Sequence, residues 1–344
     1  MKKSTYTLVI VICFLLVFLY KMTHIAGKEP ENDSNLKLSN VPENENYSSG
    51  DLVITTSSPN TDLDSTLPSP EVIPDILSPS ISGKIIYYDD KKTAIIDASN
   101  TSHGYVSVCY NGSNPKVKVR IEANDNMYNY DLPSNGEYTV YPLQFGDGIY
   151  TISVFENASK NQYMTLFTQK ITVKLEDENS VFLYPNQYVW FTKDSDVVYK
   201  SAQVCNGLTK DIDKVSAIFN YITQSVEYDY EKAENVKSGY LPQVDTILST
   251  KKGICFDYAA LFAAMCRVQG IPCKLITGYV SPDWLYHAWN EVYTEEKGWI
   301  TASFYLEKEG YNTVDPTFYS NMSDSNKAAE YIGTGTNYQE YHIY

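Results

Sequence analysis

The pattern of apolar and polar positions predicts two regions with different secondary structure. Residues 81–177 contain short runs in which apolar and polar side chains alternate, such as Lys-Val-Lys-Val-Arg-Ile at 116–121. Alternation with a period of two indicates strands, and turn signals such as Asn111-Gly112 separate the runs. Several short strands within about a hundred residues predict an all-β sandwich of immunoglobulin-like size.

The second region, residues 181–344, begins with apolar side chains that recur every three or four positions. This period indicates helices, which are predicted at 195–205, at 211–226 and from 255 onward. Gly270 and Pro272 signal the end of the third helix. Strands follow at 271–280 and 287–294. We therefore expect an α+β domain in which helices pack on an antiparallel sheet.

Three side chains in this second region could carry chemistry. Cys255 opens the third predicted helix, where the helix dipole and free N–H groups favour an anion and should ease ionisation of the thiol. His287 follows 32 positions later on a predicted strand, and Asp315 follows a further aromatic run. Cysteine, histidine and aspartate in this order could form a nucleophile, its base and the group that orients the base.

The sequence around these residues resembles a known superfamily. Gly-Ile-Cys-Phe-Asp-Tyr-Ala, Tyr-His-Ala-Trp-Asn-Glu-Val and Asp-Pro-Thr-Phe are similar to the three motifs of the transglutaminase-like superfamily, in the expected order. The resemblance covers residues 211–318 and implies a papain-like core. That superfamily includes protein cross-linkers, amidases, peptidases and members without known activity, so the resemblance is more specific for the fold than for the reaction.

The spacing before the third motif departs from the superfamily. The acid usually follows the strand tryptophan by a few residues, whereas Asp315 lies 16 positions after Trp299. We interpret the intervening residues as an inserted hairpin and assign the orienting role to Asp315. Asp283 and Glu291 are nearby carboxylates, but Glu291 lies four residues along the strand from His287, too far to bond its ring directly.

The resemblance implies acyl transfer on amide bonds of peptides or proteins. Cys255 would attack the carbonyl to form a thioester, His287 would carry the proton, and Asp315 would hold the imidazole. Hydrolysis by water and capture by an amine both remain open at this stage, and neither needs a metal or organic cofactor. The alternative is a catalytically idle surface protein that uses the same fold for binding.

The N-terminal 80 residues predict export. Residues 6–20 form an apolar run between Lys3 and Lys21, which favours a signal-anchor transmembrane segment within residues 1–27, with the bulk of the chain extracytoplasmic. A cleaved signal peptide would instead release a secreted protein. Residues 28–80 are rich in Ser, Pro, Asn and Thr, which is typical of a disordered stalk. Cell-wall or surface proteins are therefore the expected partners.

The composition and the cysteine spacing argue against several kinds of binding and structural site. The net charge of −15 and the absence of a basic stripe argue against nucleic-acid binding. The six cysteines are too scattered for a disulfide framework, and with only four histidines no zinc-ligand spacing occurs. Cys109, Cys205, Cys266 and Cys273 are expected to be buried packing residues.

Overall fold

The computed structural model describes residues 63–280, 285–302 and 338–344, all within one compact unit, Asn46–Tyr344. The predicted signal-anchor, most of the predicted stalk, most of the inserted hairpin, Asp283 and Asp315 lie outside the described residues. Among the residues that are described, no helix is long and apolar enough to cross a membrane.

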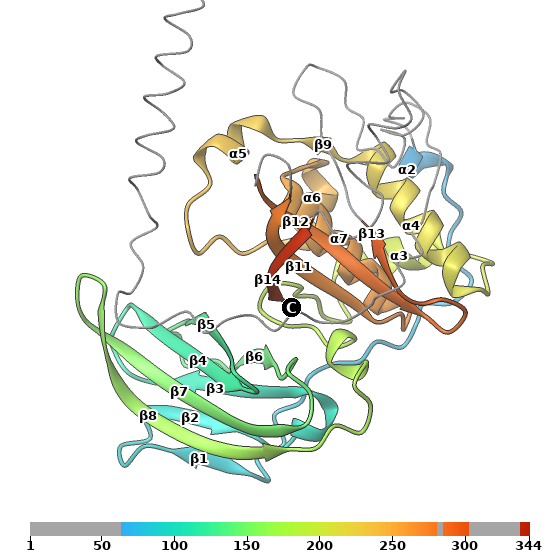
Figure 1. Cartoon of the computed structure of the whole chain (residues 1–344). Coiled ribbons are helices and arrows are strands. Elements are labelled where there is room, and N and C mark those ends of the chain that lie inside the picture. The colour runs from blue at the N-terminus through green and yellow to red at the C-terminus, as the bar shows by residue number, and fades with distance from the viewer. Residues whose placement is uncertain (1–62, 281–284, 303–337) are drawn as a thin grey trace, which may run out of the picture. The chain divides into compact units, whose positions relative to one another are not determined.

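The first half of the described chain forms two antiparallel four-stranded sheets, as the alternating pattern predicts (Figure 1). One sheet has the order β1 (Ile86–Tyr88), β2 (Ala94–Asp97), β3 (Tyr105–Tyr110), β6 (Thr139–Pro142). The other has the order β5 (Asn126–Leu132), β4 (Val117–Ala123), β7 (Gly148–Ser159), β8 (Gln162–Val173). A 3-10 turn, η1 (Thr101–His103), precedes β3. The β-sheet-rich region is confirmed, and its immunoglobulin-like character stays a prediction.

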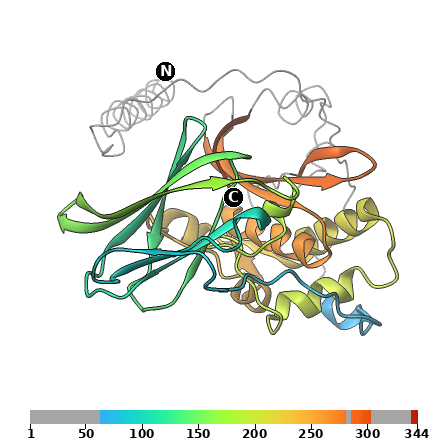
Figure 2. The same ribbon diagram turned by 90° about the horizontal axis from the view of Figure 1, so that it is seen from below.

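The second half is the expected α+β domain (Figures 1 and 2). Its helical segments are η2 (Ser180–Phe182), α3 (Asp196–Val204), α4 (Asp211–Ser225), α5 (Tyr230–Asn235), α6 (Val244–Thr250) and α7 (Cys255–Val268). Its strands are the short pair β9 (Glu227–Tyr228) and β10 (Lys252–Gly253), and then β11 (Cys273–Val280), β12 (Leu285–Thr294), β13 (Gly298–Ala302) and β14 (Tyr338–Ile343). The last four form an antiparallel sheet in the order β13-β12-β11-β14, and α7 packs on β11 and β12.

Helix α7 is the centre of this domain and begins at Cys255, as predicted. Every residue from Asp257 to Val268 is buried, so the helix is apolar almost all round rather than amphipathic. Its Ala-rich sequence keeps its surface small, which lets α3, α4 and α6 approach it closely. Gly270 adopts a φ of +74°, which stops the helix and turns the chain into β11.

Side chains of strand β12 alternate between its two faces. Ala288, Asn290 and Val292 are buried, and the Asn290 side chain donates to the Ala259 carbonyl of α7 at 3.0 Å. Trp289, on the other face, packs with Ile276 in a separate small cluster. The register between β11 and β12 places Gly278 opposite His287 and Thr277 opposite Ala288.

The β-sheet region and the α+β domain share one continuous cluster of buried side chains. Tyr128 of β5 accepts a hydrogen bond from the Ile343 backbone at 2.9 Å, and its ring meets His342 edge-on. Arg267, fully buried in α7, donates to the carbonyls of Tyr184, Cys273 and Tyr344, and burial lowers its pKa to about 10. The two regions therefore pack against each other and share a core.

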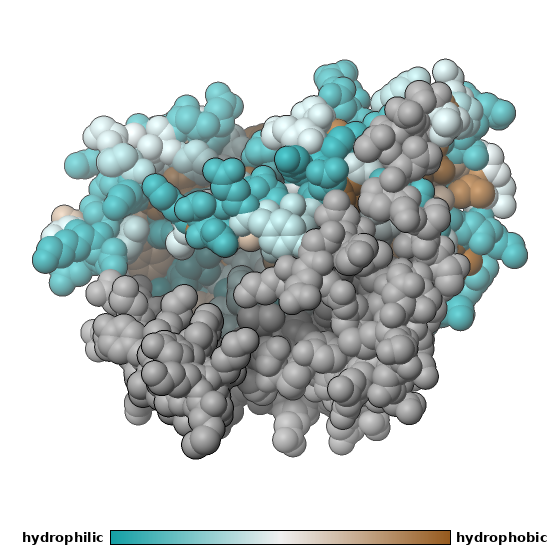
Figure 3. All heavy atoms as spheres, turned by 90° about the horizontal axis from the view of Figure 1, so that it is seen from above, coloured by the Kyte–Doolittle hydropathy of each residue, from teal (hydrophilic) through white to brown (hydrophobic). Residues whose placement is uncertain are grey.

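The segment before β1 also packs on the α+β domain. Asp64, in the short helix α2 (Leu63–Thr66), bonds to Lys200 at 2.9 Å, to Lys251 at 2.5 Å and to the Tyr221 hydroxyl at 2.8 Å. The sequence predicts a disordered stalk through residue 80, whereas in the structure residues 63–80 contact the folded regions. On the face drawn in Figure 3, hydrophilic residues predominate among those that are coloured.

Candidate functional site

Cys255 is the first residue of α7, and its sulfur lies among backbone N–H groups. Ile254 precedes the helix in an extended conformation, and the Asp257 carboxylate accepts the Ile254 N–H at 2.9 Å. The N–H groups of Ala288, Phe256 and Cys255 itself lower the pKa of the thiol by hydrogen bonding to its charged form. One of these donors comes from β12, so the sheet as well as the helix contributes to the environment of the sulfur.

Burial nevertheless outweighs these donors. The predicted effect of the helix N-terminus was easier ionisation of Cys255, but desolvation raises the pKa of its thiol from 9.0 to about 11. Although the residue keeps some solvent exposure, the walls around the sulfur remove most of the water that would hydrate a thiolate. At neutral pH the resting side chain is therefore a thiol, and a base must take its proton before it can attack.

His287 lies on β12 and lines the same cleft as Cys255. The structure thus brings two of the three predicted residues together from segments 32 positions apart. Asp315 lies outside the described residues, and its place beside His287 stays a prediction. Glu291 points to a different partner, since its carboxylate binds the Lys274 ammonium at 2.7 Å.

The cleft around Cys255 has a volume of about 570 Å³ and an aromatic lining. Six aromatic rings from separate segments contribute to it: Tyr188, Tyr228, Tyr240, Phe256, Tyr286 and Tyr344. His342 also lines it, and burial lowers the pKa of this histidine to about 4, so its ring is neutral at pH 7. Sequence reasoning missed this lining because the 31 tyrosines show no period that would single these out.

Comparisons with known proteins agree with this geometry. Residues 199–304 match the profile of the transglutaminase-like superfamily. They form a transglutaminase-like superfamily domain. The chain is 36% identical over 118 residues to the kyphoscoliosis peptidase of Mus musculus, which covers 31% of this chain and 17% of that protein. It is 30% identical over 86 residues to the protein-glutamine gamma-glutamyltransferase of Pseudomonas aeruginosa, which covers 22% of this chain and 11% of that protein.

Among solved structures, a candidate cysteine protease from Cytophaga hutchinsonii is 18% identical, with a TM-score of 0.31, over 58% of this chain and 78% of that one. The chain spans about a sixth of the length of the curated peptidase that it matches. The match to the superfamily profile begins within α3 and ends just past β13.

The β-sheet region contributes to the rim of the cleft in the transglutaminase-like domain. Lys118 of β4 and Asp131 of β5 form an ion pair at 2.6 Å, and both line the cleft together with Asn129. The Asp131 backbone carbonyl also accepts the Gln187 side chain at 2.6 Å. Charged and polar side chains of the β-sheet region thus line the cleft together with the aromatic rings.

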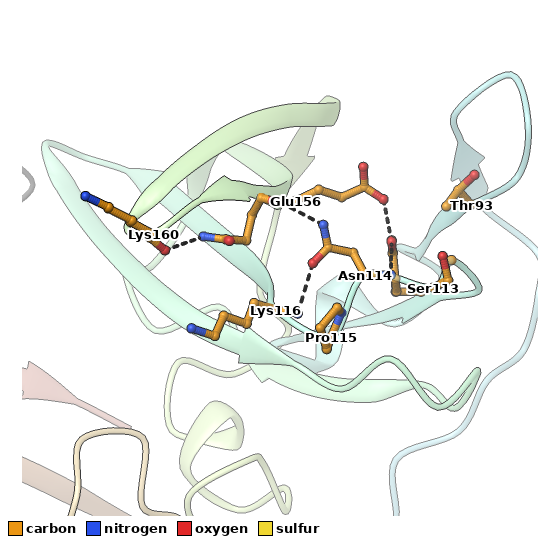
Figure 4. Close-up of a pocket in the computed structure, with 10 residues that line it drawn as sticks. Thr93, Ser113, Asn114, Pro115, Lys116, Glu156 and Lys160 are labelled. Atoms are coloured by element: carbon orange, nitrogen blue, oxygen red, sulfur yellow. Dashed lines mark hydrogen bonds between the residues drawn. The ribbon is translucent and has the colours of Figure 1, made fainter.

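A second cavity, of about 660 Å³, lies within the β-sheet region and away from the transglutaminase-like domain (Figure 4). The Tyr110 hydroxyl donates to Glu156 there, and the Asn114 side chain donates to the Asn157 carbonyl at 2.8 Å. The described residues that line it include neither cysteine nor histidine. Among the described residues, this cavity therefore lacks the cysteine–histidine pair that the cleft around Cys255 has.

Proposed function

We propose that this protein is a thiol acyl-transfer enzyme that acts on amide bonds of peptides or proteins, with Cys255 as nucleophile, His287 as base and Asp315 as the group that orients His287. The observation that carries the proposal is the position of Cys255 at the start of α7, in one cleft with His287. The similarity of residues 199–304 to the transglutaminase-like superfamily supports it.

The raised pKa of Cys255 determines how the reaction would begin. Because the thiol is neutral at rest, His287 would remove its proton as the sulfur attacks the amide carbonyl, rather than hold a preformed ion pair. The amine would then leave with that proton, and a thioester would remain on Cys255. The N–H groups of Ala288, Phe256 and Cys255 would stabilise the negative charge that develops on the sulfur as its proton moves to His287, before the bond to the carbonyl carbon is complete.

We favour hydrolysis of the thioester over its transfer to an amine. The likeness to a peptidase supports hydrolysis. Capture by a primary amine is the second candidate, and the likeness to a protein-glutamine gamma-glutamyltransferase favours it. The aromatic lining favours peptides that carry apolar side chains beside the reacting amide.

The test uses the full chain in detergent with a library of glutamine-containing peptides and a labelled primary amine. Release of peptide fragments or ammonia without label supports hydrolysis, and incorporation of the label supports transfer. Either activity must disappear in Cys255→Ala and fall strongly in His287→Ala and Asp315→Ala. A wild-type chain that binds peptides but neither cleaves nor labels them would favour the idle binding protein.

The protonation of Cys255 has its own test, which needs no substrate. Alkylation of Cys255 by iodoacetamide, followed by mass spectrometry, should speed up about tenfold for each pH unit between 7 and 10, because the thiolate fraction rises below a pKa of about 11. A rate that is already flat above pH 6 would contradict the neutral resting thiol and indicate an ion pair with His287.

We further propose that residues 6–20 anchor the protein in the cell membrane and that the folded part acts outside the cytoplasm, on cell-wall or surface proteins. The apolar run and the two lysines before it support this placement. Membrane fractionation and protease protection of whole cells test it, since recovery of the uncleaved chain in the soluble fraction would contradict an anchor.

A further inference from the structure

We infer that Lys232, Tyr240 and Asp257 form a clamp that holds residues 228–240 over Cys255 and thereby sets access to the cleft. This segment, the cleft wall, contributes Tyr228, Ala233 and residues 236–240 to the lining. The inference builds on the proposed function, because it assigns positioning residues to the same site. It concerns three side chains that take no part in the acyl-transfer steps described above.

Asp257 is the centre of the clamp. Its side chain is fully buried, two positions after Cys255 and on the same first turn of α7. One carboxylate oxygen, Oδ2, accepts the Ile254 N–H at 2.9 Å and the Lys232 ammonium at 2.5 Å. The other, Oδ1, accepts the Tyr240 hydroxyl at 2.6 Å. Both oxygens of a buried carboxylate are thus occupied, and two of the three bonds come from the cleft wall.

The other two members close the cluster. The Lys232 ammonium also donates to the Tyr240 hydroxyl at 2.6 Å and lies 4.3 Å from the centre of the Tyr240 ring. Lys232 belongs to α5, and Tyr240 ends the turn that follows that helix. Each end of the exposed part of the wall therefore has one side chain bound to the same carboxylate.

The base of the wall is held separately by backbone. Tyr228 pairs with Gly253 in the short parallel ladder of β9 and β10, and the Asp229 N–H donates to the Gly253 carbonyl at 2.9 Å. Beyond that base, residues 234–239 are exposed. Two side-chain hydrogen bonds join the wall to α7 through Asp257, one from Lys232 and one from Tyr240. Loss of the clamp should thus free the wall to move about its base.

Gly253 makes the arrangement sterically possible. A Cβ at this position would lie 2.7 Å from the Asp257 Cβ and 3.3 Å from its Oδ2. The Asp257 side chain therefore folds back over the glycine to reach the Ile254 N–H and the cleft wall. The nucleophile thus lies midway in the sequence between Gly253, which leaves space for the Asp257 side chain, and Asp257, which binds the cleft wall.

The experiment compares Lys232→Met and Tyr240→Phe with wild type, at a fixed interval below the Tm of each protein. Hydrogen exchange of residues 228–240 and the alkylation rate of Cys255 by iodoacetamide are the readouts. We expect Lys232→Met to increase both by about tenfold, because the wall opens more often, and Tyr240→Phe to increase them less. Lys232→Arg should restore most of the protection, since a guanidinium can still bind the carboxylate.

Lys200→Met is the matched control. Lys200 binds Asp64 in a similar Lys–Asp–Tyr cluster that does not line the cleft. Lys200→Met should lower the Tm without changing the hydrogen exchange of residues 228–240 or the alkylation rate of Cys255. If Lys232→Met does not fold, Tyr240→Phe decides the question, because it removes a single oxygen.

The clamp is refuted if both cleft variants lower the Tm while exchange and alkylation stay as in wild type. That outcome would leave an ordinary structural ion pair. Both readouts work without a substrate, so they test the clamp even when no amide is cleaved. A failure of the proposed function would show instead as an absence of Cys255-dependent turnover in the wild-type chain.

Discussion

Two clusters in this protein are built from the same groups and lie in different surroundings. At the cleft, Lys232 and Tyr240 bind Asp257, whose side chain is 0% exposed. At the N-terminal edge, Lys200, Lys251 and Tyr221 bind Asp64, whose side chain is 39% exposed. In both, a lysine ammonium lies over the tyrosine ring, at 4.3 Å from Tyr240 and at 5.1 Å from Tyr221.

The difference between the clusters shows that the burial of an ion pair, and not only its residue types, determines its structural role. Asp64 joins α2 to side chains more than 130 positions away, so it fastens the N-terminal segment to the domain. Water reaches its carboxylate and can replace a lost partner. Asp257 has no such replacement, because it is sealed between α7 and the cleft wall. The same kinds of side chain therefore make an exchangeable contact in one place and form a fixed part of the site in the other.

The largest expected difference is between Asp257→Asn and Asp64→Asn. An amide at position 257 would leave the partly buried Lys232 without a counter-charge, and breaking such a pair costs about 3 kcal/mol. The Asp64 substitution should cost about 1 kcal/mol or less, because exposed pairs are screened by water. Urea denaturation of both variants, analysed for midpoint and slope, measures the two losses. Equal losses would mean that burial does not distinguish the clusters.

The next prediction concerns Gly253, which serves only the buried cluster. Gly253→Ala places a Cβ against Asp257 and should cost about 2 kcal/mol through the shift that the helix start must make. The comparison is Gly207→Ala, where no atom lies within 4 Å and only the left-handed backbone, at a φ of +76°, is unfavourable. That substitution should cost about 1 kcal/mol. Thermal unfolding of both variants measures the two losses of stability. A smaller loss for Gly253→Ala than for Gly207→Ala would contradict the steric clash with Asp257.

The sequence predicted the backbone of this region better than its side-chain contacts. The Ala-rich run and Gly270 define α7 locally, and residues 287–294 form part of strand β12 as predicted. The clamp could not be predicted, because Lys232 and Tyr240 reach Asp257 only through the course of the chain between them. Strand β5 is hard to predict for a related reason, because its polar residues conceal the buried Tyr130 and Leu132.

The pKa of Cys255 illustrates the same limit. The helix N-terminus is visible in the sequence and predicts a more acidic thiol. Burial depends on the residues that surround the sulfur in the fold, and it reverses the direction of the shift. Asp315 and the anchor at residues 6–20 stay predictions, because they lie outside the described residues.

The contribution of the exposed Asp64 cluster to stability should be lost at low pH. Hydrogen bonds from Lys251, Lys200 and Tyr221 outweigh the opposing effect of burial and lower the pKa of Asp64 from 3.8 to about 2. Because the folded pKa lies below the unfolded value, this contribution is fully present above about pH 4 and is lost as the pH falls through 2. We expect the stability difference between wild type and Asp64→Asn to shrink by about 1 kcal/mol over this window, after discounting for solvent screening. A difference that stays constant between pH 5 and pH 2 would contradict the assignment.

The smallest expected effect is the response to salt, and it separates the clusters without changing protonation. The Debye length falls from about 10 Å at 0.1 M salt to about 3 Å at 1 M, so exposed pairs weaken and buried pairs scarcely change. The cost of Asp64→Asn should therefore drop by a few tenths of a kcal/mol between these conditions, while the cost of Asp257→Asn stays the same. Urea denaturation at both salt concentrations measures the change. A comparable drop at Asp257 would mean that water and ions reach its carboxylate, and the cleft wall could then not be sealed against α7.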